Sequence, residues 1–467
     1  MLLYNQMGKA VHAPLDSVHP KLQPPSSVGL KYQTPNTHKG VSLPSEVLDK
    51  LESIWQDLPK FEVFPAAPAR LMPYLYSNDD FGNTAVQPGA LVPIVPLERE
   101  AQGAKYWLAG HGLRYSLQQT FTYAAMSDVA TGDGDLGNYN LYFPLKWTVF
   151  EARGAGTAGW LSAEIQYQTA IGSSGSQTAQ SNLGTITNPT GIWFARSGFQ
   201  VPELAWQQSF EAGHIVALAG VIDQSNYIDT NAYANSGRGQ FLNSALINSM
   251  VLPLPAYNYG LNLQWQPHKD WYAILGYSVG NAAAGESPDT NFGWESWSLE
   301  WEFGYAPSDV LGLGPGVYRI QPFLARNGTV QGGLCFNFQQ QLGKSSPFGW
   351  FGRFGAGGSH ASGAFNVEGG AKAQVGTGFV MQAPLRYAGW VPQLSNDLLG
   401  VGFAWSQPSA TSSTVYHNNE YVLETFYTMQ LSPMSQLQPD LQIVWNPAFN
   451  PDAGPAVVFQ FQFLLKW

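Results

Sequence analysis

The side chains best suited to chemistry are carboxylates, amides and guanidinium groups that recur at every second position in the later part of the chain. In residues 297–305, for example, Glu300 and Glu302 alternate with Leu299, Trp301 and Phe303. Such groups supply paired hydrogen-bond donors and acceptors, which suits the reversible binding of hydroxyl-rich solutes better than a covalent reaction.

Patterns that would indicate catalysis or a metal are weak. Residues 132–137 fit the spacing G-x-G-x-x-G, but strand-like segments flank them, so we interpret them as a turn and not as a dinucleotide site. Asp133 and Asp135 lack the rest of a calcium-loop pattern. The histidines show no H-E-x-x-H spacing, and no G-x-S-x-G nucleophile elbow is present. We therefore expect no cofactor, no metal and no enzymatic activity.

The elements that carry these side chains have the period of β-strands from about residue 105 to the end. Large apolar and polar residues alternate, so each segment has one apolar and one polar face. About 16 segments of ~9–13 residues fit strands that cross a membrane at a tilt. They are residues 112–125, 140–152, 159–169, 202–210, 213–223, 256–267, 270–280, 294–306, 316–326, 332–342, 347–357, 368–383, 396–407, 420–432, 437–446 and 455–467.

Composition narrows the class of protein. Charged residues are only 12% of the 467 residues, about half the usual share, while aromatic residues reach 14%. No stretch approaches the ~20 apolar residues of a transmembrane helix. A formal charge of −10 disfavours a nucleic-acid partner, and the single Cys335 precludes an intramolecular disulfide. We predict an all-β fold, a transmembrane antiparallel β-barrel, because only closed barrels place strands in lipid.

The last strand gives the strongest local signal. Residues 457–467 place apolar side chains at every second position and end on Trp467, an arrangement that looks like the C-terminal signal of bacterial outer-membrane barrels. In a soluble protein so apolar an edge strand would aggregate unless it were covered. We therefore expect contact with outer-membrane lipid and with the barrel-assembly machinery.

The first part of the chain differs. Residues 1–104 are Pro-rich and extended, with one amphipathic helix at 45–58, and we predict a periplasmic segment there and a barrel domain at 105–467. The start shows no apolar signal-peptide core, so an exported protein would be a mature form or begin at a different start.

Several runs of residues resemble the carbohydrate-selective porins of the OprB type. They are Gly110–Arg114, Pro202–Phe210, Gln240–Ser244 with Leu252–Pro255, and Leu437–Gln442. The resemblance covers roughly residues 105–467 and implies a barrel of about 16 strands that lets sugars diffuse across the bacterial outer membrane. A monomer and a homotrimer both stay open.

Sorting the strands by face gives the predicted pore lining, since polar positions point inward in a channel barrel. We predict that solutes contact Arg114, Glu164, Glu203, Gln207, Asp223, Arg238, Asn243, Glu300, Glu302, Arg319, Arg353, Glu424 and Asp440. The same face carries Gln118, Lys146, Gln166, Asn262, Gln264, Gln321, Asn337, Gln339, Lys372, Gln430 and Gln442.

Inward-folding loops would form the constriction. Candidates are residues 224–250, with Asp229, Arg238, Asn243 and Ser244, and residues 281–293, with Glu286 and Asp289. The mixed charge favours sugars, because an anion channel would show a basic excess. Two alternatives stay open: a structural or adhesive barrel with a closed lumen, and a barrel lipase, for which no persuasive Ser–His pair is found. For any one polar residue, a structural ion pair across the interior is the competing interpretation.

Overall fold

Alternating burial along the strands shows how the sequence builds the wall. In β15 (Glu420–Ser432) buried and partly exposed residues alternate along its whole length, and β17 (Ala456–Lys466) does the same at its start. The outward side chains are large and apolar, including Leu263, Phe303, Phe379 and Phe461. The polar face is turned inward, as the sequence predicted.

The computed structural model describes residues 90–92, 101, 104–105, 107–152, 156–172, 174–175, 177–191, 198–255, 257–279, 296–344, 346–358, 370–392, 394–409, 418–450 and 452–467. The predicted helix at 45–58 and the loop at 281–293 lie outside these residues. No helix within them is long and apolar enough to cross a membrane.

Seventeen strands are described in this part of the chain, and sixteen of them close a barrel. The bounds are β1 Leu113–Tyr115, β2 Gln118–Met126, β3 Asp135–Ala152, β4 Thr157–Ile171, β5 Gly198–Phe210, β6 Ile215–Ile222, β7 Asn258–His268, β8 Trp271–Val279, β9 Ser296–Tyr305, β10 Gly316–Asn327, β11 Thr329–Gln341, β12 Phe348–Gly357, β13 Ala371–Gln382, β14 Leu398–Pro408, β15 Glu420–Ser432, β16 Ser435–Trp445 and β17 Ala456–Lys466.

From β2 onward each strand pairs antiparallel with the next one along the chain, and β17 pairs with β2 to close the ring. The predicted barrel of about 16 strands is therefore confirmed. The predicted first strand, 112–125, is divided into β1 and β2, which lie along the same edge of β3. Leu117, between them, exchanges backbone hydrogen bonds with Trp467.

One predicted inward position lies at an irregularity of the wall. Lys372 is exposed, and the register between β13 and β14 shifts between Ala371 and Ala373. Such a shift inserts an extra residue whose direction does not follow the alternation of the strand, so the inward placement of Lys372 stays a prediction.

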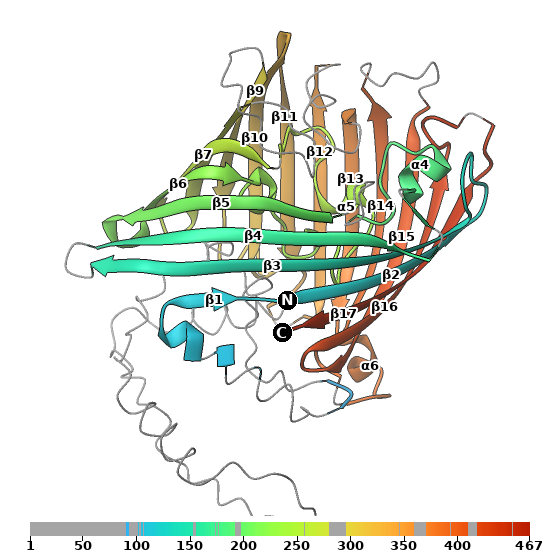
Figure 1. Ribbon diagram of the computed structural model, residues 1–467, viewed down its shortest axis with the longest axis horizontal. Helices are drawn as coiled ribbons and strands as arrows, with labels where there is room; N and C mark the ends of the chain where they lie inside the picture. Colours follow the sequence, from blue (N-terminus) through green and yellow to red (C-terminus); the bar gives the residue numbers. More distant parts are fainter. Residues whose placement is uncertain are drawn as a thin grey trace, which may run out of the picture.

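Helices are few and short in the described residues. Figure 1 shows α4 (Ala179–Leu183) at one rim of the barrel and α6 (Pro384–Tyr387) at the opposite rim. On the α4 side the connections include the long segments 172–197 and 223–257, whereas on the other side 211–214 and 433–434 are tight turns. The long connection between β6 and β7 carries α5 (Ser244–Ile247).

Candidate functional site

The connection between β6 and β7 folds into the barrel and crosses its lumen. We call residues 223–255 and 257 the inward loop. At its start Asn226 donates to Glu164 on β4 (3.0 Å). Further along, the backbone N–H of Leu242 donates to Glu424 on β15, on a different part of the wall (2.5 Å). The predicted inward loop at 224–250 therefore does enter the lumen.

The centre of the inward loop is fixed by a buried ion pair. Arg353 Nε lies 3.0 Å from Asp229 Oδ2, and both side chains are at most 2% exposed. The guanidinium also donates to the backbone carbonyls of Asp229 and Leu246 (both 2.8 Å). Asn337 and the backbone N–H of Ser249 donate to the same Asp229 carboxylate (2.7 and 2.6 Å). Together these partners offset the free-energy cost of burying the charges of Arg353 and Asp229.

Glu302 on β9 forms a second attachment. Its carboxylate accepts from the backbone N–H of Asp229 (2.9 Å), from Tyr272 (2.7 Å) and from Gln321 (2.8 Å). Arg319 Nε lies 3.4 Å from Glu302 and donates to Tyr272 Oη (2.9 Å). Glu302, Arg319 and Arg353, all predicted as pore-lining residues, are thus brought together around one point of the loop.

Glu424 on β15 forms a third attachment. One carboxylate oxygen accepts from Leu242 N (2.5 Å) and the other from Asn243 N (3.0 Å). The Asn243 side chain caps α5 by accepting from Ala245 N, and it donates to Gln442 on β16 (3.0 Å). Asn243 is fully buried, so in this structure it organises the loop rather than facing open solvent.

Apolar packing completes the attachment of the loop. The Phe241 ring lies between Phe351 on β12 and Phe426 on β15, with centroid distances of 5.2 and 4.8 Å. A Cβ atom at Gly402 on β14 would lie 2.7 Å from the Phe241 ring. Glycine at this position is therefore what lets the loop pack directly against the strand.

A second polar group lies where β3, β4 and β5 adjoin. Glu164 and Glu203 are direct cross-strand partners, a placement in which two like charges repel each other. Tyr142 donates to Glu164 (2.6 Å), and Tyr227 of the inward loop donates to both oxygens of Glu203 (2.8 Å each). Gln207, also predicted, accepts from Lys146 (2.7 Å).

The tip of the inward loop carries Arg238. Its guanidinium donates to Asn140 (2.8 Å) and lies 4.3 Å from the centre of the Tyr142 ring, both on β3. The neighbouring carbonyls accept from the wall: Gly237 O from Gln462 and Gly239 O from Thr428. Arg238 is only partly buried, unlike most of the predicted set.

A second segment, residues 177–191 between β4 and β5, also reaches the interior. Glu420 on β15 accepts from the backbone N–H groups of Ile186 and Thr187 (2.9 and 3.1 Å). Gln442 and Gln460 both donate to Pro189 O. Sequence reasoning did not select Glu420, although its spacing of four residues from Glu424 places both on the same strand face.

The thirteen predicted residues fall into two groups by exposure. Ten of them, Glu164, Glu203, Gln207, Asn243, Glu300, Glu302, Arg319, Arg353, Glu424 and Asp440, are no more than 8% exposed. Arg114 is exposed, and Asp223 and Arg238 are partly buried. Arg114 pairs in register with Lys146, whereas Asp440 accepts from Gln442 and Gln460 (2.9 and 3.3 Å). Their contact with solutes stays a prediction.

Asp223 lies just after β6, at the start of the inward loop. Asp223 caps the short 3-10 helix η3 (Gln224–Asn226) by accepting from Ser225 N and Ser225 Oγ. Burial raises the pKa of the Asp223 carboxyl, and these two hydrogen bonds offset part of that rise.

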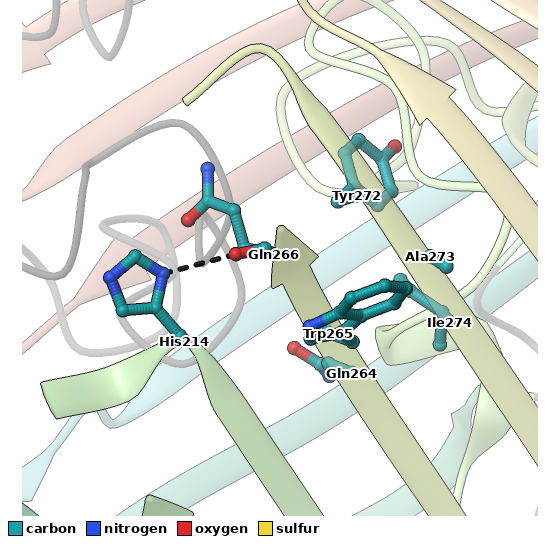
Figure 2. Close-up of a pocket in the computed structure, with 7 residues that line it drawn as sticks. All are labelled: His214, Gln264, Trp265, Gln266, Tyr272, Ala273 and Ile274. Atoms are coloured by element: carbon teal, nitrogen blue, oxygen red, sulfur yellow. Dashed lines mark hydrogen bonds between the residues drawn. The ribbon is translucent and has the colours of Figure 1, made fainter. Parts of the chain in front are cut away.

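A small pocket lies near the rim opposite α4, and its size excludes a sugar. Figure 2 shows His214 pointing at the backbone of Gln266, whose carbonyl lies 3.0 Å from His214 Nδ1. The volume, about 10 Å³, holds about one water molecule. The lining residues are His214, Gln264, Trp265, Gln266, Tyr272, Ala273 and Ile274.

No group of three or more His, Cys, Asp or Glu suited to a metal is found in the part of the chain that the structure describes. Asp133, considered as a calcium ligand from the sequence, accepts from Gln177 through its side chain (2.9 Å).

Comparison with known proteins gives consistent matches. Residues 155–331 and 323–466 match the family model described as carbohydrate-selective porin, OprB family. Porin AaxA of Chlamydia felis is 23% identical over 358 residues, 74% of this chain and 75% of that protein. Porin AaxA of Chlamydia abortus is 26% identical over 239 residues, half of each chain. A solved structure of Pseudomonas putida OprB has a TM-score of 0.62 at 15% identity, covering 79% of this chain and 97% of that one.

Proposed function

Because the chain belongs to the OprB family of porins and is a β-barrel of the bacterial outer membrane, we propose that it lets carbohydrates, mono- or oligosaccharides, diffuse passively through its lumen. The family consists of channels, and no covalent step is part of the proposal. The selectivity of the channel is set by the width of the pore and by weak binding of the solute to groups that line the path.

One observation carries this proposal: the inward loop is held inside the barrel by both acidic and basic side chains. Glu302, Glu424 and Arg353 place acidic and basic groups in the same interior, so the part of the interior that the structure describes has no basic excess of the kind that an anion channel needs. Amides such as Asn140 and Gln462 add donors and acceptors that match sugar hydroxyls.

Liposome swelling tests the proposal. Vesicles that contain the purified protein are diluted into isosmotic glucose, maltose or a larger oligosaccharide. We expect swelling that slows as the sugar grows. Swelling no faster than in empty vesicles would refute passive sugar diffusion, whereas a reversal potential that departs strongly from zero in a salt gradient would indicate an ion-selective channel.

The close packing of the interior favours a second candidate, a barrel with a closed lumen and a structural or adhesive role. Ten of the thirteen predicted lining residues are buried. Single-channel recording separates the two candidates, because a permanently closed barrel gives no current steps at any voltage at which the bilayer is stable.

Three finer points accompany the proposal. We infer that the barrel domain runs from 105 to 467 after a periplasmic segment at 1–104, which limited proteolysis of vesicles would test. The barrel-assembly machinery would recognise β17 and Trp467, so removal of the last residue should lower the folded yield in the membrane. A monomer or a homotrimer would be distinguished by chemical cross-linking in the native membrane.

A further inference from the structure

A patch of neutral polar side chains lines the inner wall where the barrel closes. We call Thr120, Thr122, Asn138, Asn140 and Gln462 the neutral seam. The register places Thr120 opposite Asn140, and Thr122 between Asn138 and Gln462, so the five side chains form one continuous surface over β17, β2 and β3. Each is at most 5% exposed.

The neutral seam contains buried polar atoms that lack partners. Within the described residues, Thr120 Oγ1, Thr122 Oγ1, Asn138 Oδ1, Asn140 Nδ2 and Gln462 Oε1 make no hydrogen bond. Such atoms are rare in native proteins, and a cluster of them indicates a place where water or a ligand completes the bonding. Buried polar atoms without partners also occur on other described strands, for example at Ser298 on β9 and Gln321 on β10, and at the neutral seam five of them lie on three adjacent strands.

The three amides of the neutral seam each use only one end for the protein. Asn138 Nδ2 donates to Thr169 O (3.4 Å), Asn140 Oδ1 accepts from Arg238 (2.8 Å), and Gln462 Nε2 donates to Gly237 O (2.8 Å). The opposite end of each amide is therefore available for a further partner, while its first bond keeps the side chain oriented.

The available atoms define the chemistry of that partner. Asn138 Oδ1 and Gln462 Oε1 only accept, Asn140 Nδ2 only donates, and the two threonine hydroxyls do both. A phosphate or carboxylate, which only accepts, would leave the two amide oxygens unsatisfied. An ammonium group, which only donates, would leave Asn140 Nδ2 unsatisfied. A neutral polyhydroxylated solute can pair with all five.

The part of the inward loop that covers the neutral seam is the part with the weakest attachment. We call residues 236–240 the tip. Besides Arg238, the tip is held through the backbone carbonyls of Gly237, Gly239 and Gln240 by neutral side chains of the wall. Elsewhere the loop is held by the Asp229–Arg353 ion pair and by Glu302, which lies 3.4 Å from Arg319, and hydrogen bonds between charged groups are about twice as strong as neutral ones.

We propose that permeating sugars pass between the tip and the neutral seam, and that their hydroxyls bind the five unpartnered atoms as the tip moves aside. This inference rests on the proposed function and adds to it a path and a binding surface. The solute class is a neutral compound with hydroxyls on several carbons.

The first experiment removes hydroxyls without changing shape. In T120V/T122V, sugar block of the single-channel ion current should weaken by about two- to tenfold for each lost hydrogen bond. Polyethylene glycol of similar size offers only ether acceptors along its length, so its block should weaken less than that of the sugar. The matched control is S406A, which removes a buried hydroxyl that likewise lacks a partner but lies on β14, away from the neutral seam.

The second experiment closes the path. In G237C/Q462C, made in a C335A background, a short bifunctional methanethiosulfonate joins the tip to the neutral seam. Ion current and sugar uptake should both disappear and return on reduction. Equal maltose block in wild type and T120V/T122V, or current that persists after complete cross-linking, would overturn the proposal. Neither result would contradict the proposed function, because that function fails only if the wild-type protein admits no sugar.

Discussion

Two regions of the same inner wall hold the inward loop in different ways. On the anchoring side, defined by Glu302, Arg353 and Glu424, carboxyl and guanidinium side chains bind backbone groups and the Asp229 carboxylate of the loop. On the neutral seam, uncharged amides and hydroxyls contact the tip and leave five polar atoms unpaired. The polar inner face of the barrel wall thus fixes the loop firmly on the anchoring side and makes weaker contacts with the tip at the neutral seam.

The difference teaches how a charged interior can serve a neutral solute. A buried charge is costly unless it is paired, so charges that hold the loop are already occupied and contribute little to solute binding. Neutral polar atoms cost less when unpaired and exchange partners more readily. In this barrel the groups that hold the constriction and the groups that contact sugars should therefore be separable by mutation.

The largest expected effect comes from removing the buried guanidinium. R353M leaves the Asp229 carboxylate buried without its cation, which should destabilise the barrel by about 3–5 kcal/mol. Urea unfolding from detergent micelles, followed by tryptophan fluorescence, measures this change. The double variant R353M/D229N should recover much of the loss. A stability equal to that of wild type in R353M alone would show that the anchoring side does not depend on this pair.

A smaller effect is expected at Glu424. In E424Q one carboxylate oxygen becomes an NH₂ group facing the backbone N–H of Leu242 or Asn243, so one bond is lost and two donors meet. The expected cost is about 1–3 kcal/mol, with more frequent flicker of the single-channel current.

The control for Glu424 is E420Q. Glu420 holds residues 186–187 of the other inward segment, so this variant should lose comparable stability with little added flicker of the inward loop. Equal flicker in the two variants would mean that attachment at Glu424 is not specific to the inward loop.

Asp223 is a charged residue whose side-chain bonds stay local, and its expected effect is smaller again. Burial raises the pKa of its carboxyl in the folded state, so its contribution to stability is full below the unfolded pKa and is lost as pH rises through the folded value. D223N keeps the acceptor for Ser225 and removes the charge. It should therefore be more stable than wild type at pH 7, and this advantage should vanish near pH 3. Unfolding midpoints at both pH values measure it, and an equal difference at the two would exclude titration of Asp223.

The barrel could be predicted from the sequence because apolar and polar residues alternate along each strand with a period of two residues. Phe459 and Phe461 alternate with Gln460 and Gln462, and lipid on one side leaves only one way to orient such a strand. The register shift beside Lys372 could not be predicted, because it depends on the pairing of two strands, which no single strand reveals. The break between β1 and β2 has the same origin, since Leu117 pairs with Trp467 at the other end of the chain.

The sequence predicted which residues lie in the interior of the barrel, but it did not predict the contacts that each of them makes. Glu302 and Arg353 could be assigned to the interior, but their partners are the backbone N–H and carbonyl groups of a loop, which look the same in any sequence. Gly402 carries information only once Phe241 is known to pack on it. The neutral seam depends on which atoms lack partners, and that property exists only in the folded arrangement.

The smallest expected change in stability is on the neutral seam. Thr120 Oγ1 and Thr122 Oγ1 are buried without partners, so the folded state already bears the cost of removing them from water. Valine has nearly the same shape and keeps the branched Cβ that strands favour. T120V/T122V should therefore unfold within about 1 kcal/mol of wild type or be slightly more stable, in contrast to R353M. Unfolding in urea under identical conditions decides this. A loss as large as that of E424Q would show that the two hydroxyls stabilise the fold, and the contrast between the two sides of the wall would then disappear.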